Sequence, residues 1–142
     1  MAGFAQAVAV ASAAGALGAP VNLPVSSTTP VLTVPVTAGT WLVTVNLDVQ
    51  YLGAALANFE CQATQGTATA TLTGVTADGT ELGNVAGGAE QAPLNLSFVA
   101  VVTVAGNLSV TVKNPNGVTV GTCLASSGSY AGSSGYTALK IA

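Results

Sequence analysis

The chain of 142 residues has no histidine and no arginine, and it has only two lysines against five acidic residues. Charged residues make up 5% of the sequence, whereas the average is about 25%. Two lysines cannot neutralise a row of phosphates, so nucleic-acid binding is not expected. Attraction to an anionic membrane surface is not expected for the same reason. No run of 18 apolar residues occurs, so no transmembrane helix is expected either.

The absence of histidine also argues against catalysis, because the usual base for a serine or cysteine nucleophile is missing. Three of the five acidic residues lie in a glycine-rich stretch, where solvated turn carboxylates are common: Asp78, Glu81 and Glu90. Their segment, "ADGTELGN", does not match the spacing of an EF-hand calcium loop. We therefore expect no enzymatic activity, no metal site and no cofactor.

Cysteine is scarce as well. Cys61 and Cys123 are too few for a disulfide framework. We favour two buried thiols that pack as small hydrophobic groups. The alternative is a single disulfide, which would close a loop of about 62 residues and stabilise the fold by roughly 4 kcal/mol.

Alternating strands are what the sequence has in abundance. The stretch "AGTWLVTVNLDVQY", residues 38–51, places apolar and polar residues on opposite sides of an extended chain, and only Leu42 breaks the pattern. Residues 76–93 are expected to form a long glycine-rich loop, and Pro35 indicates an edge strand. The sequence therefore predicts an all-β jelly-roll sandwich of eight or nine strands. The other predicted strands are residues 31–36, 58–64, 67–75, 94–104, 108–113, 118–125 and 136–142.

Residues 1–30 differ in composition from the rest, which divides the chain into an extended N-terminal arm (1–30) and a jelly-roll domain (31–142). The arm begins with an alanine-rich piece, and prolines at positions 20, 24 and 30 then favour extended backbone. Two arrangements are open: another protein surface holds the arm, or the arm packs on its own domain. The few sizeable apolar side chains of the alanine-rich piece are Phe4, Val8, Val10 and Leu17.

Three segments give the order of strands and turns: "TPVLTVPVTAGTWLVTVNLDVQY" with its Gly39-Thr40-Trp41 turn, "LNLSFVAVVTVAGNLSVTVK", and the closing strand "YTALKIA". This order resembles the TNF/C1q-like jelly-roll proteins and, more narrowly, small structural proteins of tailed actinobacterial phages. The resemblance covers about residues 28–142. It implies trimers in which one sheet face is buried around a threefold axis. Phages use such trimers to decorate capsids and as knobs on tail fibres.

These observations give two functional expectations. The first is a capsid decoration protein on the virion exterior, a homotrimer that stabilises the head by binding the major capsid protein, with Phe4, Val8, Val10 and Leu17 as anchors of the arm. The alternative is a tail-fibre or receptor-binding module that recognises host surface glycans. For that role the candidates are Tyr130 and Tyr136, in the last long loop.

Overall fold

The structure of the chain is a computed structural model that describes residues 11–83, 90–114, 121–123 and 134–142. The described residues form β-strands and no helix, so none of them belongs to a helix long and apolar enough to span a membrane. The strands are β1 (Ala11–Ala16), β2 (Val21–Leu23), β3 (Ser27–Val36), β4 (Gly39–Tyr51), β5 (Ala57–Thr64), β6 (Thr69–Val75), β7 (Ala77–Leu82), β8 (Glu90–Val104), β9 (Gly106–Asn114), β10 (Gly121–Cys123) and β11 (Gly135–Lys140).

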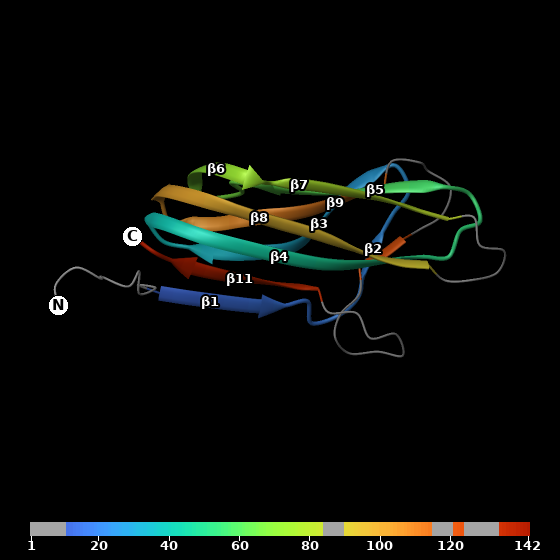
Figure 1. The fold of residues 1–142 in the computed structure, drawn as a ribbon, viewed down its shortest axis with the longest axis horizontal. Coiled ribbons are helices and arrows are strands. Elements are labelled where there is room, and N and C mark those ends of the chain that lie inside the picture. Colours follow the sequence, from blue (N-terminus) through green and yellow to red (C-terminus); the bar gives the residue numbers. More distant parts are fainter. Residues whose placement is uncertain (1–10, 84–89, 115–120, 124–133) are drawn as a thin grey trace, which may run out of the picture.

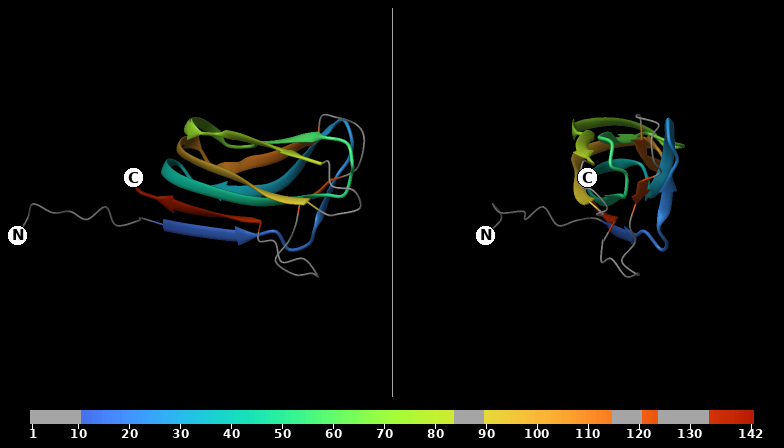
Figure 2. Two further views of the ribbon diagram at one scale, coloured as in Figure 1. Left: turned by 45° about the vertical axis from the view of Figure 1, so that its right-hand side comes forward. Right: turned by 90° about the vertical axis from the view of Figure 1, so that its right-hand side faces the viewer.

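The strands form two antiparallel sheets that pack face to face (Figures 1 and 2). In the seven-stranded sheet, sheet A, the long strand β4 pairs along one edge with β8 and along its other edge with β11 and β10. Strands β6, β1 and β2 extend this sheet by pairing with β8, β11 and β10 respectively. The four-stranded sheet, sheet B, has the order β3-β9-β5-β7.

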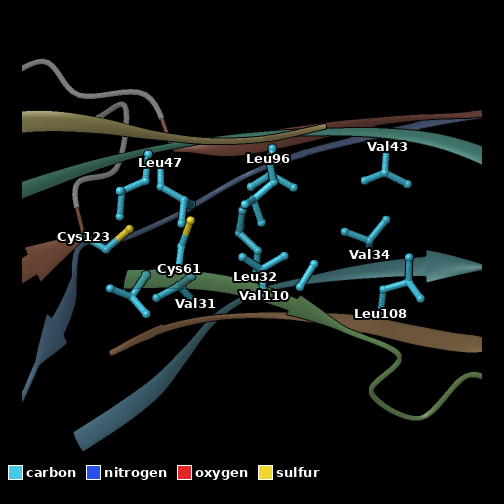
Figure 3. Packing of buried hydrophobic residues seen from close by; sticks show 14 of the residues in the cluster. Val31, Leu32, Val34, Val43, Leu47, Cys61, Leu96, Leu108, Val110 and Cys123 are labelled. Atoms are coloured by element: carbon cyan, nitrogen blue, oxygen red, sulfur yellow. The ribbon is translucent and has the colours of Figure 1, made fainter. Parts of the chain in front are cut away.

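Alternation along β4 and β8 builds the core, as the sequence pattern predicts. The odd-numbered residues of β4 from Trp41 to Tyr51 are all at most 4% exposed, and the even-numbered residues of β8 from Leu94 to Val102 are buried opposite sheet B. Figure 3 shows how aliphatic side chains and two sulfur atoms from both sheets fill the space between them. The core therefore consists mainly of leucine, valine and alanine, with few aromatic rings.

The prolines mark strand edges. Pro30 and Pro35 both lie in β3, which is the outermost strand of sheet B and pairs only with β9. Proline cannot donate a backbone hydrogen bond, so it is tolerated where one edge of a strand has no neighbour. The edge position predicted from Pro35 is confirmed.

Residues 11–30 take the second of the two arrangements considered for the N-terminal segment, because they pack on their own domain. Strand β1 pairs with β11, β2 pairs with β10, and β3 begins at Ser27, so a boundary after residue 30 falls inside a strand. Apart from the buried Leu17 and Leu23, these short segments carry few large apolar side chains. Their backbone groups nevertheless satisfy the hydrogen-bonding edges of β11 and β10, and this contribution is invisible in a hydrophobic pattern.

Strand β7 lies in the stretch that was expected to be a loop, so that expectation is corrected. The hydrophobic alternation of β7 is weak, because the strand carries Asp78, Gly79 and Glu81. It is an edge strand that pairs with β5 alone. The Asp78 carboxylate accepts hydrogen bonds from the backbone N–H of Gly79 at 2.9 Å and from that of Asn95 in β8 at 2.9 Å. One side chain thus joins the edge of sheet B to sheet A.

Replacing Asp78 with asparagine should lower the free energy of unfolding by about 1 kcal/mol, because an amide has one oxygen to offer the two N–H donors. Urea unfolding at neutral pH would measure this loss. Glu81→Gln is the matched control on the same strand, since Glu81 is exposed, and its effect should stay within about 0.5 kcal/mol. Equal effects of the two changes would contradict a joining role for Asp78.

Candidate interaction face

The outer face of sheet A carries a continuous set of side chains without charge, which we call the uncharged face. Cross-strand pairs place Leu42 of β4 between Val99 of β8 and Leu139 of β11. The next row places Thr44 between Ser97 and Thr137. The uncharged face comprises Thr40, Leu42, Thr44, Thr71, Thr73, Val75, Ser97, Val99, Val101, Thr137 and Leu139.

Four large apolar side chains of this face are exposed to solvent. Leu42 is 41% exposed, Val75 53%, Val101 47% and Leu139 37%. They belong to four neighbouring strands, so they form one patch and are not scattered singly. Contiguous exposed apolar surface of this kind is typical of an interaction site.

A shallow hollow of about 330 Å³ lies within the uncharged face, where β6, β8, β4 and β11 run side by side. Leu42, Leu139, Val99 and several threonines line it. At its edge Gly74 adopts a φ of +122°, and a Cβ atom there would lie 2.9 Å from the carbonyl oxygen of Ser97. Glycine at this position therefore lets β6 approach β8 closely beside the hollow.

The charged side chains of the described residues lie elsewhere. Glu60 and Lys113 are paired neighbours on the outer face of sheet B, where Glu81 is also exposed. A second hollow, of about 460 Å³, is lined there by Glu60, Lys113, Asp78 and polar side chains. Lys140 donates a hydrogen bond from Nζ to Thr37 Oγ1 at 3.1 Å. Asp48 lies on the same outer side of β4 as Leu42 and Thr44, but it is half-buried and lies beyond Asn46, outside the uncharged face. The uncharged face itself thus carries no charged side chain, whereas the outer face of sheet B carries several.

Burial of the uncharged face against another protein has a low desolvation cost. Threonine and serine hydroxyls lose water less expensively than charged groups, and leucine and valine gain from leaving it. The same burial on sheet B would have to desolvate a carboxylate and an ammonium group. Of the two outer faces, the uncharged face of sheet A would therefore be the less costly one to cover.

Of the four residues expected to anchor the N-terminal arm, the structure describes one. Leu17 is 8% exposed and belongs to the core, and its backbone N–H donates to the carbonyl oxygen of Ser134 at 2.8 Å. Leu17 is thus a core residue of its own domain. Phe4, Val8 and Val10 lie outside the described residues.

Of the two tyrosines expected to recognise glycans, the structure also describes one. Tyr130 lies outside the described residues, whereas Tyr136 is the second residue of β11 and packs half-buried against the core. Tyr136 pairs with Gly15 of β1, and its ring occupies the space that a side chain at position 15 would need. Tyr136 therefore covers a glycine of the edge strand, as aromatic side chains often do in sheets.

Cys61 and Cys123 are free thiols, both fully buried, from facing sheets. Burial, with a smaller contribution from the nearby Asp78 charge, raises the pKa of Cys61 to about 12. Burial also raises the pKa of Cys123, against the opposing effect of the Ser134 hydroxyl, whose oxygen lies 3.4 Å from the sulfur. Both thiols are thus held in the neutral form.

The pKa of Cys61 predicts a loss of stability in alkali. The unfolded thiol ionises near pH 9, whereas the folded thiol stays protonated to about pH 12, so this contribution is complete below pH 9 and is lost between pH 9 and 12. The slope should approach about 1.4 kcal/mol per pH unit. Urea unfolding at several pH values should show a shallower decline for Cys61→Ala than for the wild type; equal slopes would contradict this assignment.

Among the residues that the structure describes, no group of three or more His, Cys, Asp or Glu side chains could hold a metal ion. The arrangement that stands out is the uncharged face, and the sequence pattern does not single out its residues. One signal was present, because Leu42 breaks the alternation of β4 and lies at the centre of the uncharged face.

Comparison with known proteins identifies the fold. No family model and no curated protein matches the chain. Among solved structures, the chain is similar to the structure of Eiger TNF from S. frugiperda, with a TM-score of 0.53 and 15% sequence identity over 92% of each chain. At this identity the likeness concerns the fold alone. The chain has an all-β, TNF-like jelly-roll fold of two antiparallel sheets.

Proposed function

We propose that this chain is a structural protein of a phage virion, which assembles into a homotrimer through the uncharged face of sheet A. In its most specific form, the proposal is a capsid decoration protein that binds the major capsid protein on the exterior of the head. The resemblance of residues 28–142 to jelly-roll proteins of tailed phages supports the viral setting. The observation that carries the assembly is the uncharged face itself.

A threefold axis explains why charge should be absent from such a face. Near the axis of a cyclic trimer, each side chain meets the same side chain from the other two copies, so any charge there meets its own sign. Leucine, valine and threonine can meet their own copies without repulsion. The rows around Leu42 and Val99 meet this requirement, whereas the Glu60 and Lys113 face of sheet B does not.

The same features support a structural role over a catalytic one. The sequence offers no histidine, and the two buried cysteines are kept neutral, so the described residues provide no activated nucleophile. Tyr136, named for glycan recognition, covers Gly15 and is half-buried. No observation favours the tail-fibre alternative.

Two measurements on the purified chain, made one after the other, test the proposal. Light scattering after size exclusion should give three times the mass of the chain. Co-sedimentation with undecorated phage heads should then show saturable binding in multiples of three, and host cell envelopes run in parallel should bind nothing. Binding to envelopes alone would move the protein to the tail. A monomer that binds neither would overturn both parts of the proposal.

A further inference from the structure

We propose that Cys61 and Cys123 form a latent disulfide site, which a small-molecule disulfide such as oxidised glutathione converts into a covalent link between sheets A and B. The link would join β5 to the three-residue strand β10. This inference concerns the fold of one subunit and does not depend on how the chain assembles.

Contacts of the residues two positions before each cysteine show that β5 and β10 face each other across the sandwich. Gly121 of β10 pairs with Tyr51, and the Tyr51 ring meets the Phe59 ring edge-on, with centroids 5.5 Å apart. A Cβ atom at Gly121 would lie only 2.5 Å from Cε1 of Phe59, so the Phe59 ring rests directly on this glycine. Phe59 of sheet B and Gly121 of sheet A are therefore in contact across the core.

The cysteines are each two residues further along the same strands. Cys61 follows Phe59 on the inner side of β5, and Cys123 follows Gly121 on the inner side of β10, where it pairs with Val49 of β4. Both strands run toward the end of the sandwich where β4 begins. Strand β10 is antiparallel to β4 and passes from Tyr51 toward Val49. Strand β5 ends at Thr64, which pairs with Ser109 near the start of β9, and the start of β9 pairs with the end of β3 that leads into β4.

The two sulfur atoms consequently occupy neighbouring places in the core. Figure 3 shows the sulfurs of Cys61 and Cys123 in the space between the sheets, on the same side of the view, near Leu47. Two opposed inner positions on facing sheets can carry a disulfide when their Cα atoms approach to about 6 Å.

The reaction is a balanced pair of thiol–disulfide exchanges. The thiolate of one cysteine attacks oxidised glutathione, which forms a mixed disulfide and releases one glutathione thiolate. The second cysteine thiolate then attacks the protein-bound sulfur and releases a second glutathione. The two thiol protons are taken up by the two departing thiolates, so two protein thiols are oxidised while one glutathione disulfide is reduced.

Cys123 is the residue that should react first. It lies in a strand of three residues, and its sulfur contacts the Ser134 hydroxyl, an effect that favours the thiolate. Cys61 lies within the eight-residue strand β5, which is paired on both sides, and the pKa of Cys61 is about 12. Local opening of β10 would expose Cys123 at far lower cost than opening of β5 would expose Cys61.

The decisive experiment compares the equilibrium of this exchange in the folded and the unfolded chain. The wild-type protein is incubated with defined ratios of reduced and oxidised glutathione, in buffer and in 6 M guanidinium chloride (a concentration of about that order unfolds most domains). Acid quenching, alkylation and intact-mass measurement then give the fraction in which two thiols have been lost without added mass. Peptide mapping identifies the link, and Cys61→Ala and Cys123→Ala each provide a control that cannot form it.

We expect the internal disulfide to form at least ~10-fold more favourably in the folded chain, because a cross-link that fits the native state is stabilised by it. The oxidised protein should then melt at least roughly 5 °C higher than the reduced protein. A ratio near one or below would overturn the proposal, since the native fold would then not hold the sulfurs in bonding geometry. Mixed glutathione disulfides or linked chains in place of the internal bond would overturn it as well.

Discussion

Replacing Leu42 with lysine is expected to convert the proposed trimer into a folded monomer. Leu42 is 41% exposed in the isolated chain, so an ammonium group there remains hydrated and the subunit keeps its fold. In a trimer three such groups would be desolvated near one another, at a cost of about 3 kcal/mol or more for each, so association should weaken by roughly 100-fold or more for each subunit that joins. Sedimentation velocity across a range of concentrations measures the change.

Thr33→Lys is the matched control for this variant. Thr33 is exposed on β3, on the outer face of sheet B, so the substitution adds the same charge to the opposite side of the molecule. It should leave the mass of the assembly and its binding to phage heads unchanged. If Leu42→Lys and Thr33→Lys both remain trimeric, the uncharged face is not the interface.

The largest effect on stability is expected at the contact between Phe59 and Gly121. Phe59 is fully buried, and truncation to alanine should lower the free energy of unfolding by about 3–5 kcal/mol. Gly121→Ala places a methyl group 2.5 Å from the ring atom Cε1, and this overpacking should cost about 1–3 kcal/mol. When Phe59 is already truncated, the same methyl group has room.

The two changes should therefore be strongly non-additive, with a coupling of about 1–3 kcal/mol in a double-mutant cycle measured by urea unfolding. Phe59→Leu removes the same ring edge with a smaller loss of volume and keeps the cycle measurable if the alanine variant is too unstable. Gly18→Ala serves as a control, because nothing lies within 4 Å of a Cβ atom there. Additive effects would mean that β5 and β10 do not touch, which would also remove the basis for the disulfide.

The sequence pattern predicted the elements that bury side chains in strict alternation. Strands β4 and β8 were found because every second residue is apolar over a long run, and the edge position of β3 followed from Pro35. Strands β1, β2 and β7 were missed for one reason: they are edge or near-edge strands whose contribution is mostly backbone hydrogen bonding. Backbone groups are the same for every residue, so no side-chain pattern reveals them.

The uncharged face was hidden in the sequence for a related reason. Its members come from β4, β6, β8 and β11, which are far apart in the chain, and threonine is common on any exposed sheet. In the sequence only Leu42 departs from the alternation, and one exposed leucine does not predict a patch while its cross-strand neighbours are unknown. The structure shows that Leu42 pairs with Val99 and Leu139, so that the three side chains lie together.

The pairing of β1 with β11 also determines where the two ends of the described fold lie. Ala11 lies opposite Lys140, and the carbonyl oxygen of Ala142 accepts a hydrogen bond from Thr40 at the start of β4 (Figure 1). Both ends of the described fold therefore lie at one pole of the sandwich. If the threefold axis of the proposed trimer runs along the strands, a peptide or enzyme fused after Ala142 would be displayed in a ring of three at that pole, while the opposite pole would stay free of cargo.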